Sequence, residues 1–320
     1  MLDTNTEKNT EFTLPITLQP ERLDKVLAKL LPEHSRSRLQ GWIEAGHVYV
    51  NAVAVTRQRH VVLPGDNITV YEQASPEELA FEPEAIDFPV VADTPQWIVV
   101  DKPAGLVTHP GAGNWSGTLL NGLLHRYPEL KNVARAGIVH RLDKLTSGLM
   151  VVARTPEAQT HLVRQLQERS VKRHYAALVH GFTPSQASIE LPIGRDPHVP
   201  VRMATNGSAA RAALTHYQTL RHGLDREGRA YSELACQLHT GRTHQIRVHL
   251  ASQQHPLVGD ELYGGKLVLG AERQMLHARA LAFIDPATNE WVEFESPLPA
   301  DITAVQESIE WKTQLLPSAG

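Results

Sequence analysis

Residues 136–153 read AGIVHRLDKLTSGLMVVA. The apolar run Leu149–Ala153 predicts a buried strand, and Ile138-Val139 predicts a short extended piece before it. A single acid, Asp143, stands between the two, among the cations His140, Arg141 and Lys144. Nearby positive charge favours the ionised form of a carboxyl group, so Asp143 could serve as a nucleophile or a base. From the pattern alone, an ordinary loop ion pair with a neighbouring cation is the alternative.

Length and composition predict a globular cytoplasmic protein. The chain of 320 residues suffices for one large domain and a small one, and no apolar run approaches the length of a membrane span. Residues 1–12 are polar and lack the pattern of a signal peptide, so we expect a disordered tail. The lone Cys236 excludes an internal disulfide and a cysteine-based zinc site.

Charge is distributed unevenly along the chain. The net charge of −4 argues weakly against a nucleic-acid partner, and residues 72–93 contain acids but no Lys or Arg. Cations are concentrated around Asp143, at Arg135, Arg141, Lys144, Arg154, Arg164, Arg169, Lys172 and Arg173. A basic face near a candidate nucleophile is typical of phosphate contacts, although a solvated helix over 156–169 would explain part of it.

An N-terminal module is predicted over residues 13–75. Apolar spacing indicates a helix over 22–31, and Ser35 or Ser37 can cap a second helix that Gly46 ends. Short strands are expected at 47–51 and 67–70, with a turn at 64–66. The segments RLD, SRSR and GxVxVN resemble the S4 RNA-binding domain; a small protein-interaction domain is the alternative. The cations expected to bind RNA are Arg22, Lys25, Arg36 and Arg38.

The acidic stretch 76–95 is the predicted linker, and 96–320 is the predicted catalytic domain. Strands are expected at 97–101, 149–154, 174–179, 214–220 and 231–238, and helices at 119–127 and 156–169. The absence of a regular βαβ period favours an α+β fold, with a mixed, largely antiparallel sheet and flanking helices, preceded by the small α/β module. The segment 194–213 is either an RNA-contacting loop or a plain connection.

Several ordered blocks carry a family resemblance. The string HRLDKxTSGLMVVA resembles the signature of the RluA-type pseudouridine synthases, and four other blocks agree in order: 101–114, 172–181, 238–250 and 255–260. The resemblance therefore covers nearly the whole chain. The segment HPGAGN at 109–114 and the N-terminal module look most like the family's D branch, which acts on large-subunit rRNA.

The resemblance implies a function for individual residues. Asp143 corresponds to the catalytic carboxylate, which attacks the base, attacks the sugar or removes a sugar proton. Arg247 would be its buried cation and hold it bidentately, and Tyr175 would stack on the extruded base. The remaining RNA contacts are expected at Arg141, His140, Lys144 and Arg242. Gly241 and Thr243 are expected to form the loop and cap of a helix that carries Arg247.

The implied substrate is a stem-loop of 23S rRNA, free or within a pre-ribosomal particle. The sequence leaves the oligomeric state open, and a monomer is our expectation. Isomerisation of uridine requires no metal and no cofactor, so none is expected. In one position the chain departs from the family string HRLDKDTSG, because Leu145 replaces the second acid. The local geometry and substrate preference are therefore open.

Three alternatives stay open at this point. A metal site could be formed by His239, His244 and His249, although their spacing fits neither one strand face nor a helical pair. The chain could be a non-catalytic RNA-binding factor in ribosome assembly. The same chemistry could also act on another rRNA or tRNA site.

Overall fold

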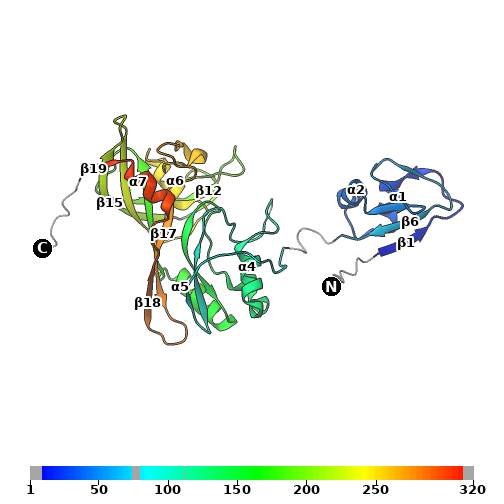
Figure 1. Cartoon of the computed structure of the whole chain (residues 1–320), viewed down its shortest axis with the longest axis horizontal. Coiled ribbons are helices and arrows are strands. Elements are labelled where there is room, and N and C mark those ends of the chain that lie inside the picture. The colour runs from blue at the N-terminus through cyan, green and yellow to red at the C-terminus, as the bar shows by residue number, and fades with distance from the viewer. Residues whose placement is uncertain (1–8, 74–79, 112, 313–320) are drawn as a thin grey trace. The chain divides into compact units, whose positions relative to one another are not determined.

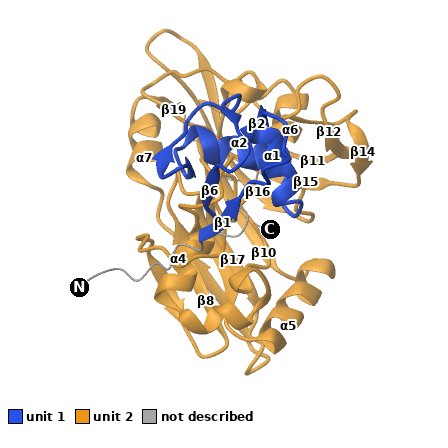
Figure 2. Cartoon of the chain, turned by 90° about the vertical axis from the view of Figure 1, so that its right-hand side faces the viewer, with its two compact units in different colours: residues 1–79 blue, residues 80–320 orange. Residues whose placement is uncertain are grey.

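A computed structural model describes residues 9–73, 80–111 and 113–312, which form two compact units, residues 1–79 and 80–320 (Figure 2). We describe each unit by itself. None of the helices in these ranges is long and apolar enough to cross a membrane.

The first unit packs two helices against a small sheet. The sheet has the order β1-β6-β3-β4, and β2 pairs with β5. Leu23, Val26 and Leu27 lie on one face of α1 and are buried in the shared core, as the apolar spacing predicts. Ser35 caps α2 by accepting a hydrogen bond from the Arg38 amide at 3.3 Å. The elements are β1 (Asn9–Thr13), β2 (Glu21–Arg22), α1 (Leu23–Leu30), α2 (Arg36–Glu44), β3 (Val48–Val50), β4 (Val53–Ala54), β5 (Val61–Val62) and β6 (Asn67–Tyr71).

The predicted tail over residues 1–12 is wrong for its last part. Asn9–Thr13 form β1, which pairs antiparallel with β6 from Asn9↔Tyr71 to Thr13↔Asn67. A polar strand at a sheet edge carries little apolar signal, because its backbone hydrogen bonds rather than its side chains place it. Residues 1–8 lie outside the described ranges.

The second unit is built on one large sheet (Figure 1). Its strand order is β11-β15-β16-β10-β17-β9-β8-β7, with β18 beside β17 and β19 beside β15. The strand pairs are antiparallel except β17 with β9, so the predicted α+β class is confirmed. The strands of this sheet are β7 (Val90–Asp93), β8 (Trp97–Lys102), β9 (Ser147–Ala153), β10 (Lys172–His180), β11 (Gln186–Glu190), β15 (Leu214–Leu224), β16 (Ala230–Leu238), β17 (Leu276–Ile284), β18 (Trp291–Glu295) and β19 (Glu310–Lys312). A separate small sheet has the order β13-β12-β14 and consists of β12 (Ile193–Arg195), β13 (Met203–Ala204) and β14 (Ser208–Arg211).

Helices cover both faces of this sheet. Along β9, Met150 and Val152 join the core beneath α4, while Leu149, Val151 and Ala153 join the core beneath α5. Thr155 caps α5 and Pro156 begins it, as predicted. Figure 2 places α4 and α5 near β8, and both figures place α6 and α7 in the other half of the unit. The helical elements are α4 (Leu119–Arg126), η1 (Pro128–Asn132), η2 (Ala134–Gly137), α5 (Pro156–Gln167), α6 (Gln245–Ser252), η3 (Glu261–Tyr263) and α7 (Ala300–Glu307).

The acidic segment predicted as a linker belongs largely to the second unit. Phe88 is buried in its core, and Val90–Asp93 form β7 against β8. The Asn121 side chain on α4 donates hydrogen bonds to the Ala80 and Glu82 carbonyls at 3.2 and 2.8 Å. These contacts could not be predicted from the acidic composition of the segment, because backbone atoms make several of them. Residues 74–79 of the predicted module end and linker lie outside the described ranges.

Candidate active site

Asp143 lies in the loop that leads into β9, and buried polar contacts hold this loop. The Thr108 hydroxyl donates to the Leu142 carbonyl at 2.8 Å, and the Thr146 amide donates to the Asp143 carbonyl at 3.0 Å. Below the loop, Lys102 donates from Nζ to the carbonyls of Pro103, Leu106 and Lys144. Burial lowers the pKa of Lys102 to about 7, against the opposing charge of Asp143. The carboxylate is thus presented on a rigid loop.

Glycine is required where this loop enters the sheet. Gly148 has φ of +116° and faces Ala278 of β17 in the parallel pair. A Cβ atom at this position would lie 2.3 Å from the Ala278 carbonyl oxygen. The close approach fixes β9 against β17, and with it the position of the loop that carries Asp143.

Arg247 on α6 connects Asp143 to a second acid. Its Nη1 donates to Asp143 Oδ2 at 3.1 Å, while Nε and Nη2 donate to Asp260 at 2.7 and 2.8 Å. Burial opposes the charge, but the hydrogen bonds and charges of Asp260 and Asp143 raise the pKa of Arg247. The ring of Tyr263 lies 5.0 Å from the guanidinium carbon. The predicted pair of Arg247 with Asp143 is therefore present.

Two details of that prediction are wrong. The bidentate partner of Arg247 is Asp260, so Asp143 receives a single hydrogen bond and keeps its other oxygen for another partner. Thr243 does not cap the helix, because α6 begins at Gln245 after His244 in a left-handed conformation with φ of +54°. Instead, the Gln245 side chain accepts hydrogen bonds from the Arg242 amide and the Thr240 hydroxyl.

His244 faces the second oxygen of Asp143. Its Nε2 lies 3.9 Å from Asp143 Oδ1, and its Nδ1 lies 2.8 Å from the Tyr263 hydroxyl. The Tyr263 hydroxyl also accepts a hydrogen bond from the Met203 amide at 2.9 Å. Burial lowers the pKa of His244, although the charge of Asp143 acts in the opposite direction. His244 is consequently neutral at neutral pH and leaves Arg247 as the cation of Asp143.

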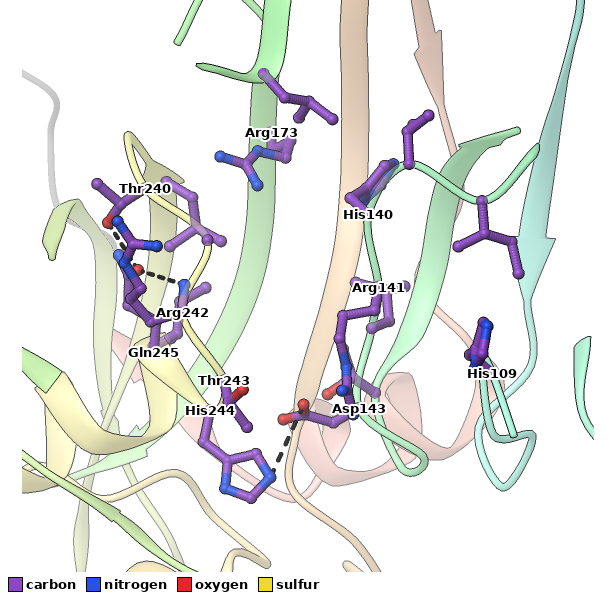
Figure 3. Close-up of a pocket in the computed structure, with 18 of the residues that line it drawn as sticks. His109, His140, Arg141, Asp143, Arg173, Thr240, Arg242, Thr243, His244 and Gln245 are labelled. Carbon is purple, nitrogen blue, oxygen red and sulfur yellow. Dashed lines mark hydrogen bonds and ion pairs between the residues drawn. The ribbon is translucent and has the colours of Figure 1, made fainter. Parts of the chain in front are cut away.

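A cavity of about 1000 Å³ opens over Asp143. Figure 3 shows the segment with His140, Arg141 and Asp143 on one side and the segment from Thr240 to Gln245 on the other. Of the described residues that line the cavity, Asp143 is the one acid, whereas the arginines are Arg135, Arg141, Arg169, Arg173, Arg242 and Arg247. A single carboxylate beneath a cationic lining suits a polyanionic substrate.

Tyr175 lines this cavity as predicted. It is 6% exposed, and burial raises the pKa of its hydroxyl to about 12, with a further rise from the charge of Asp143. The hydroxyl therefore stays protonated at neutral pH, and the ring presents an apolar surface beside the carboxylate.

Comparisons with known proteins agree with this geometry. Residues 96–252 match the RNA pseudouridylate synthase family, and residues 21–68 match the S4 domain. The ribosomal large subunit pseudouridine synthase D of Neisseria meningitidis is 50% identical over 93% of this chain and 81% of that protein. The chain belongs to the RNA pseudouridine synthase family. The enzyme of the same name from Nitrosomonas europaea is 47% identical over 95% of this synthase and 88% of that protein.

A solved structure supports the same assignment. Human RNA Pseudouridylate Synthase Domain Containing 1 superposes with a TM-score of 0.57 and 30% identity, over 77% of this synthase and 94% of the human chain. The fold, the enzyme class and the S4 domain inferred from the sequence are thereby confirmed. This pseudouridine synthase is an isomerase that acts on RNA.

The other cations predicted near Asp143 occupy different positions in the synthase. Arg141 and Arg242 line the cavity, and Arg242 Nε donates to the Ala212 carbonyl at 3.1 Å. His140 also lines the cavity, but its Nε2 accepts a hydrogen bond from the Val151 amide, and burial with the charge of Arg173 lowers its pKa to about 3. The exposed Lys144 is not among the lining residues that the structure describes. His140 is thus a neutral support for β9, and Lys144 contributes to the site through its carbonyl.

The predicted RNA-binding cations of the S4 unit are partly engaged inside it. Arg22, Arg36 and the Gln40 amide all donate to the fully buried carboxylate of Asp24. Burial alone would raise the pKa of Asp24, but these hydrogen bonds hold it well below its usual range. Arg38 donates to the Gln73 carbonyl and lies 5.2 Å over the Trp42 ring. The half-exposed Lys25 lies 3.4 Å from Glu21.

The departure at position 145 is located outside the cavity. The Leu145 side chain is exposed and is not among the described lining residues, while its carbonyl accepts from Arg273 Nη1 at 3.0 Å. The side chain at position 145 therefore has no direct contact with the cavity, and the internal hydrogen bond at this position is made by the backbone of Leu145.

The three histidines of the metal hypothesis have separate partners. His249 is buried against the Thr215 hydroxyl and the Leu191 carbonyl, His239 packs on His216, and His244 faces Asp143. Across the described ranges, no three His, Cys, Asp or Glu side chains gather in a geometry that could hold a metal ion.

Sequence reasoning missed Asp260 and Tyr263, and it counted Arg173 among the cations near Asp143 without assigning it to the site. Asp260 ends the block HPLVGD, whose resemblance was noted without a role for its acid. Arg173 stands two residues before Tyr175, and this strand spacing places both on the same side of β10. Tyr263 gave no signal, because only the tertiary structure brings it beneath Arg247.

Proposed function

We propose that this synthase isomerises uridines in a stem-loop of 23S rRNA, with Asp143 as the catalytic carboxylate. The observation that carries the proposal is that Asp143 is the one acid among the described residues of the cavity lining. It accepts a hydrogen bond from Arg247, and other arginines line the same cavity. The relatives are named ribosomal large subunit pseudouridine synthase D, and this name points to large-subunit ribosomal RNA as the substrate class. A ribosomal RNA substrate also implies a cytoplasmic location.

The reaction breaks the N1–C1′ bond of uridine, forms a C5–C1′ bond, and exchanges a proton on C5 for one on N1. Atoms and electrons balance within the nucleotide and solvent, so no metal or cofactor is called for. The carboxylate of Asp143 acts next to the broken bond, and Arg247 holds it in position with a hydrogen bond from Nη1. Tyr175 supplies the apolar face on which the extruded base rests.

Arg141 and Arg242 extend this interaction to the surrounding RNA. Both line the cavity, and Arg141 is exposed beside the catalytic loop. We assign them contacts to the strand from which the uridine is extruded, with Arg141 occupying the place that the base leaves in the stack. A target within a single-stranded loop suits this arrangement, because its bases leave the stack at low cost.

Base-resolved pseudouridine mapping on unmodified 23S rRNA tests the proposal. The wild-type protein is expected to form pseudouridine in one stem-loop without added metal, and Asp143→Asn is expected to form none while still binding the RNA. Asp87→Asn is a matched control, because Asp87 is exposed and outside the described cavity lining. Equal activity of Asp143→Asn and wild type would refute the assignment of the carboxylate.

The same experiment separates the remaining hypotheses. Activity on tRNA or on another rRNA site, but not on the stem-loop, would replace the substrate. Activity only on a pre-ribosomal particle would show that assembled RNA is recognised. RNA binding with no product on any substrate would favour a non-catalytic assembly factor. The monomeric state expected from the sequence stays a prediction.

A further inference from the structure

Arg173 is a buried cation of the cavity. It lies on β10, is 8% exposed and lines the cavity over Asp143. Its Nε atom is buried without a hydrogen-bond partner. Within the described ranges, the guanidinium group of Arg173 makes no hydrogen bond, ion pair or ring contact. Figure 3 shows Arg173 between the two sides of the cavity.

Other buried arginines of this unit are fully paired. Arg247 contacts two carboxylates, and Arg273 binds Asp301 together with several backbone carbonyls. Removing a cation from water is costly unless an opposite charge or hydrogen bonds replace the solvent. Among the residues that the structure describes, Arg173 has no such compensation, so a bound molecule that brings the opposite charge would explain its position.

The residues around Arg173 favour binding of a phosphate group. Gly241 adjoins it so closely that a Cβ atom there would lie 2.8 Å from Arg173 Nη1. Arg135 and Arg169 line the same cavity, and Asp143 is the one acid among its described lining residues. The fork of a guanidinium matches the oxygens of a phosphate group. Arg173, Tyr175 and Asp143 line the same cavity, so an RNA strand bound there can contact all three.

We propose that Arg173 binds a backbone phosphate adjoining the uridine on which Asp143 acts. The inference rests on the proposed function for the identity of the RNA. It adds a fixed point outside the reacting base: the phosphate would anchor the strand while the nucleotide rotates into the cavity. Gly241 keeps the space beside the guanidinium open, so that both phosphate oxygens can approach.

A phosphate scan in a non-reacting background tests this assignment. Full-length Asp143→Asn binds stem-loop RNAs in which a single linkage near the target uridine is an uncharged methylphosphonate. One linkage is expected to weaken binding by about 10-fold or more. After Arg173→Ala is added, neutralising that linkage should cause no further loss, because the two changes remove the same contact.

Arg226→Ala is the matched control. Arg226 is an exposed arginine in the turn between β15 and β16, outside the described cavity lining, so its removal changes the net charge equally. The affected linkage should retain its full effect in this variant. The dependence of log Kd on log salt should become shallower by about 0.7–0.9 for Arg173→Ala. Arg173→Lys, which keeps the charge but loses the fork, should restore the salt dependence and only part of the affinity.

A structural role for Arg173 would give a different result. Arg173→Met should then lower the melting temperature, whereas removal of an uncompensated buried charge should maintain or raise it. Equal effects of every linkage with and without Arg173 would overturn the phosphate assignment, even if pseudouridine mapping succeeds. Because the scan measures binding, it also tests Arg173 when the mapped RNA gives no product, which would refute the proposed function alone.

Discussion

In the S4 unit, Arg22 and Arg36 contact the buried carboxylate of Asp24, whereas in the cavity of the catalytic unit the Nε atom of Arg173 has no hydrogen-bond partner among the described residues. All three arginines belong to segments that the sequence marks as basic. Their positions differ in what balances the charge: an internal carboxylate in one unit, and a ligand in the other. A basic residue near a site is therefore available for RNA only when the fold leaves it unpaired.

Arg247 combines both situations, because it is paired with internal carboxylates and also lines the cavity. Its removal should cause the largest loss of activity. Arg247→Ala removes the cation that both Asp143 and Asp260 contact, and it leaves the buried Asp260 carboxylate without its bidentate partner. Pseudouridine formation is expected to fall by about 10²- to 10³-fold. The activity of Arg247→Lys should lie between those of wild type and Arg247→Ala, because one ammonium group cannot replace the planar guanidinium that contacts both acids.

Single-turnover kinetics on bound RNA, together with thermal melts, distinguish this role from a simple loss of folding. Arg247→Lys keeps a cation beside Asp143 and should recover part of the single-turnover rate that Arg247→Ala loses. An equal loss of rate in both variants, with a lower melting temperature for both, would instead indicate a structural defect. Arg226→Ala again serves as the control for a lost charge.

Acid should affect the catalytic unit before the S4 unit. The pKa of His140 is lowered by burial and by Arg173 from 6.5 to about 3, so between these values the unfolded chain binds a proton that the folded unit does not. Stability of the catalytic unit should then decrease as the pH falls below about 6.5. Asp24 has a pKa below the ordinary value of 3.8, so its contribution is complete above about pH 4 and is lost only below it.

Hydrogen exchange between pH 7.5 and 4 measures the two units separately. Residues 80–312 should lose protection first, and His140→Asn should reduce that loss because its amide oxygen can still accept from Val151. Earlier loss of protection in residues 9–73 would contradict the assignment.

Within the S4 unit, two cations should differ by a smaller amount. Lys25→Gln removes a half-exposed charge and should weaken RNA binding by a few-fold and lower the salt slope by about 0.9, with little effect on stability. Arg36→Gln removes a donor from buried Asp24 and should lower the stability of the unit by about 1–3 kcal/mol. Binding titrations at several salt concentrations, with thermal melts of both variants, measure the difference. Similar melting temperatures for the two would show that Asp24 does not depend on Arg36.

The sequence by itself determined the family, the α+β fold and the principal elements. Short-range patterns suffice for the elements, because burial on both faces of β9 requires a continuous apolar run and capping residues mark the start of a helix. Ordered blocks such as HRLDK and HQIRVH also pointed to Asp143 and Arg247, which line one cavity together with Tyr175.

Only the tertiary structure decided how the charges are paired. Asp260 lies thirteen residues after Arg247 and takes the bidentate position predicted for Asp143, which is 104 residues before it. The edge strands β1 and β7 likewise depend on backbone bonds to distant partners rather than on apolar side chains. Ion pairs and edge strands depend on what the fold brings together, and a local pattern of residue types contains no such information.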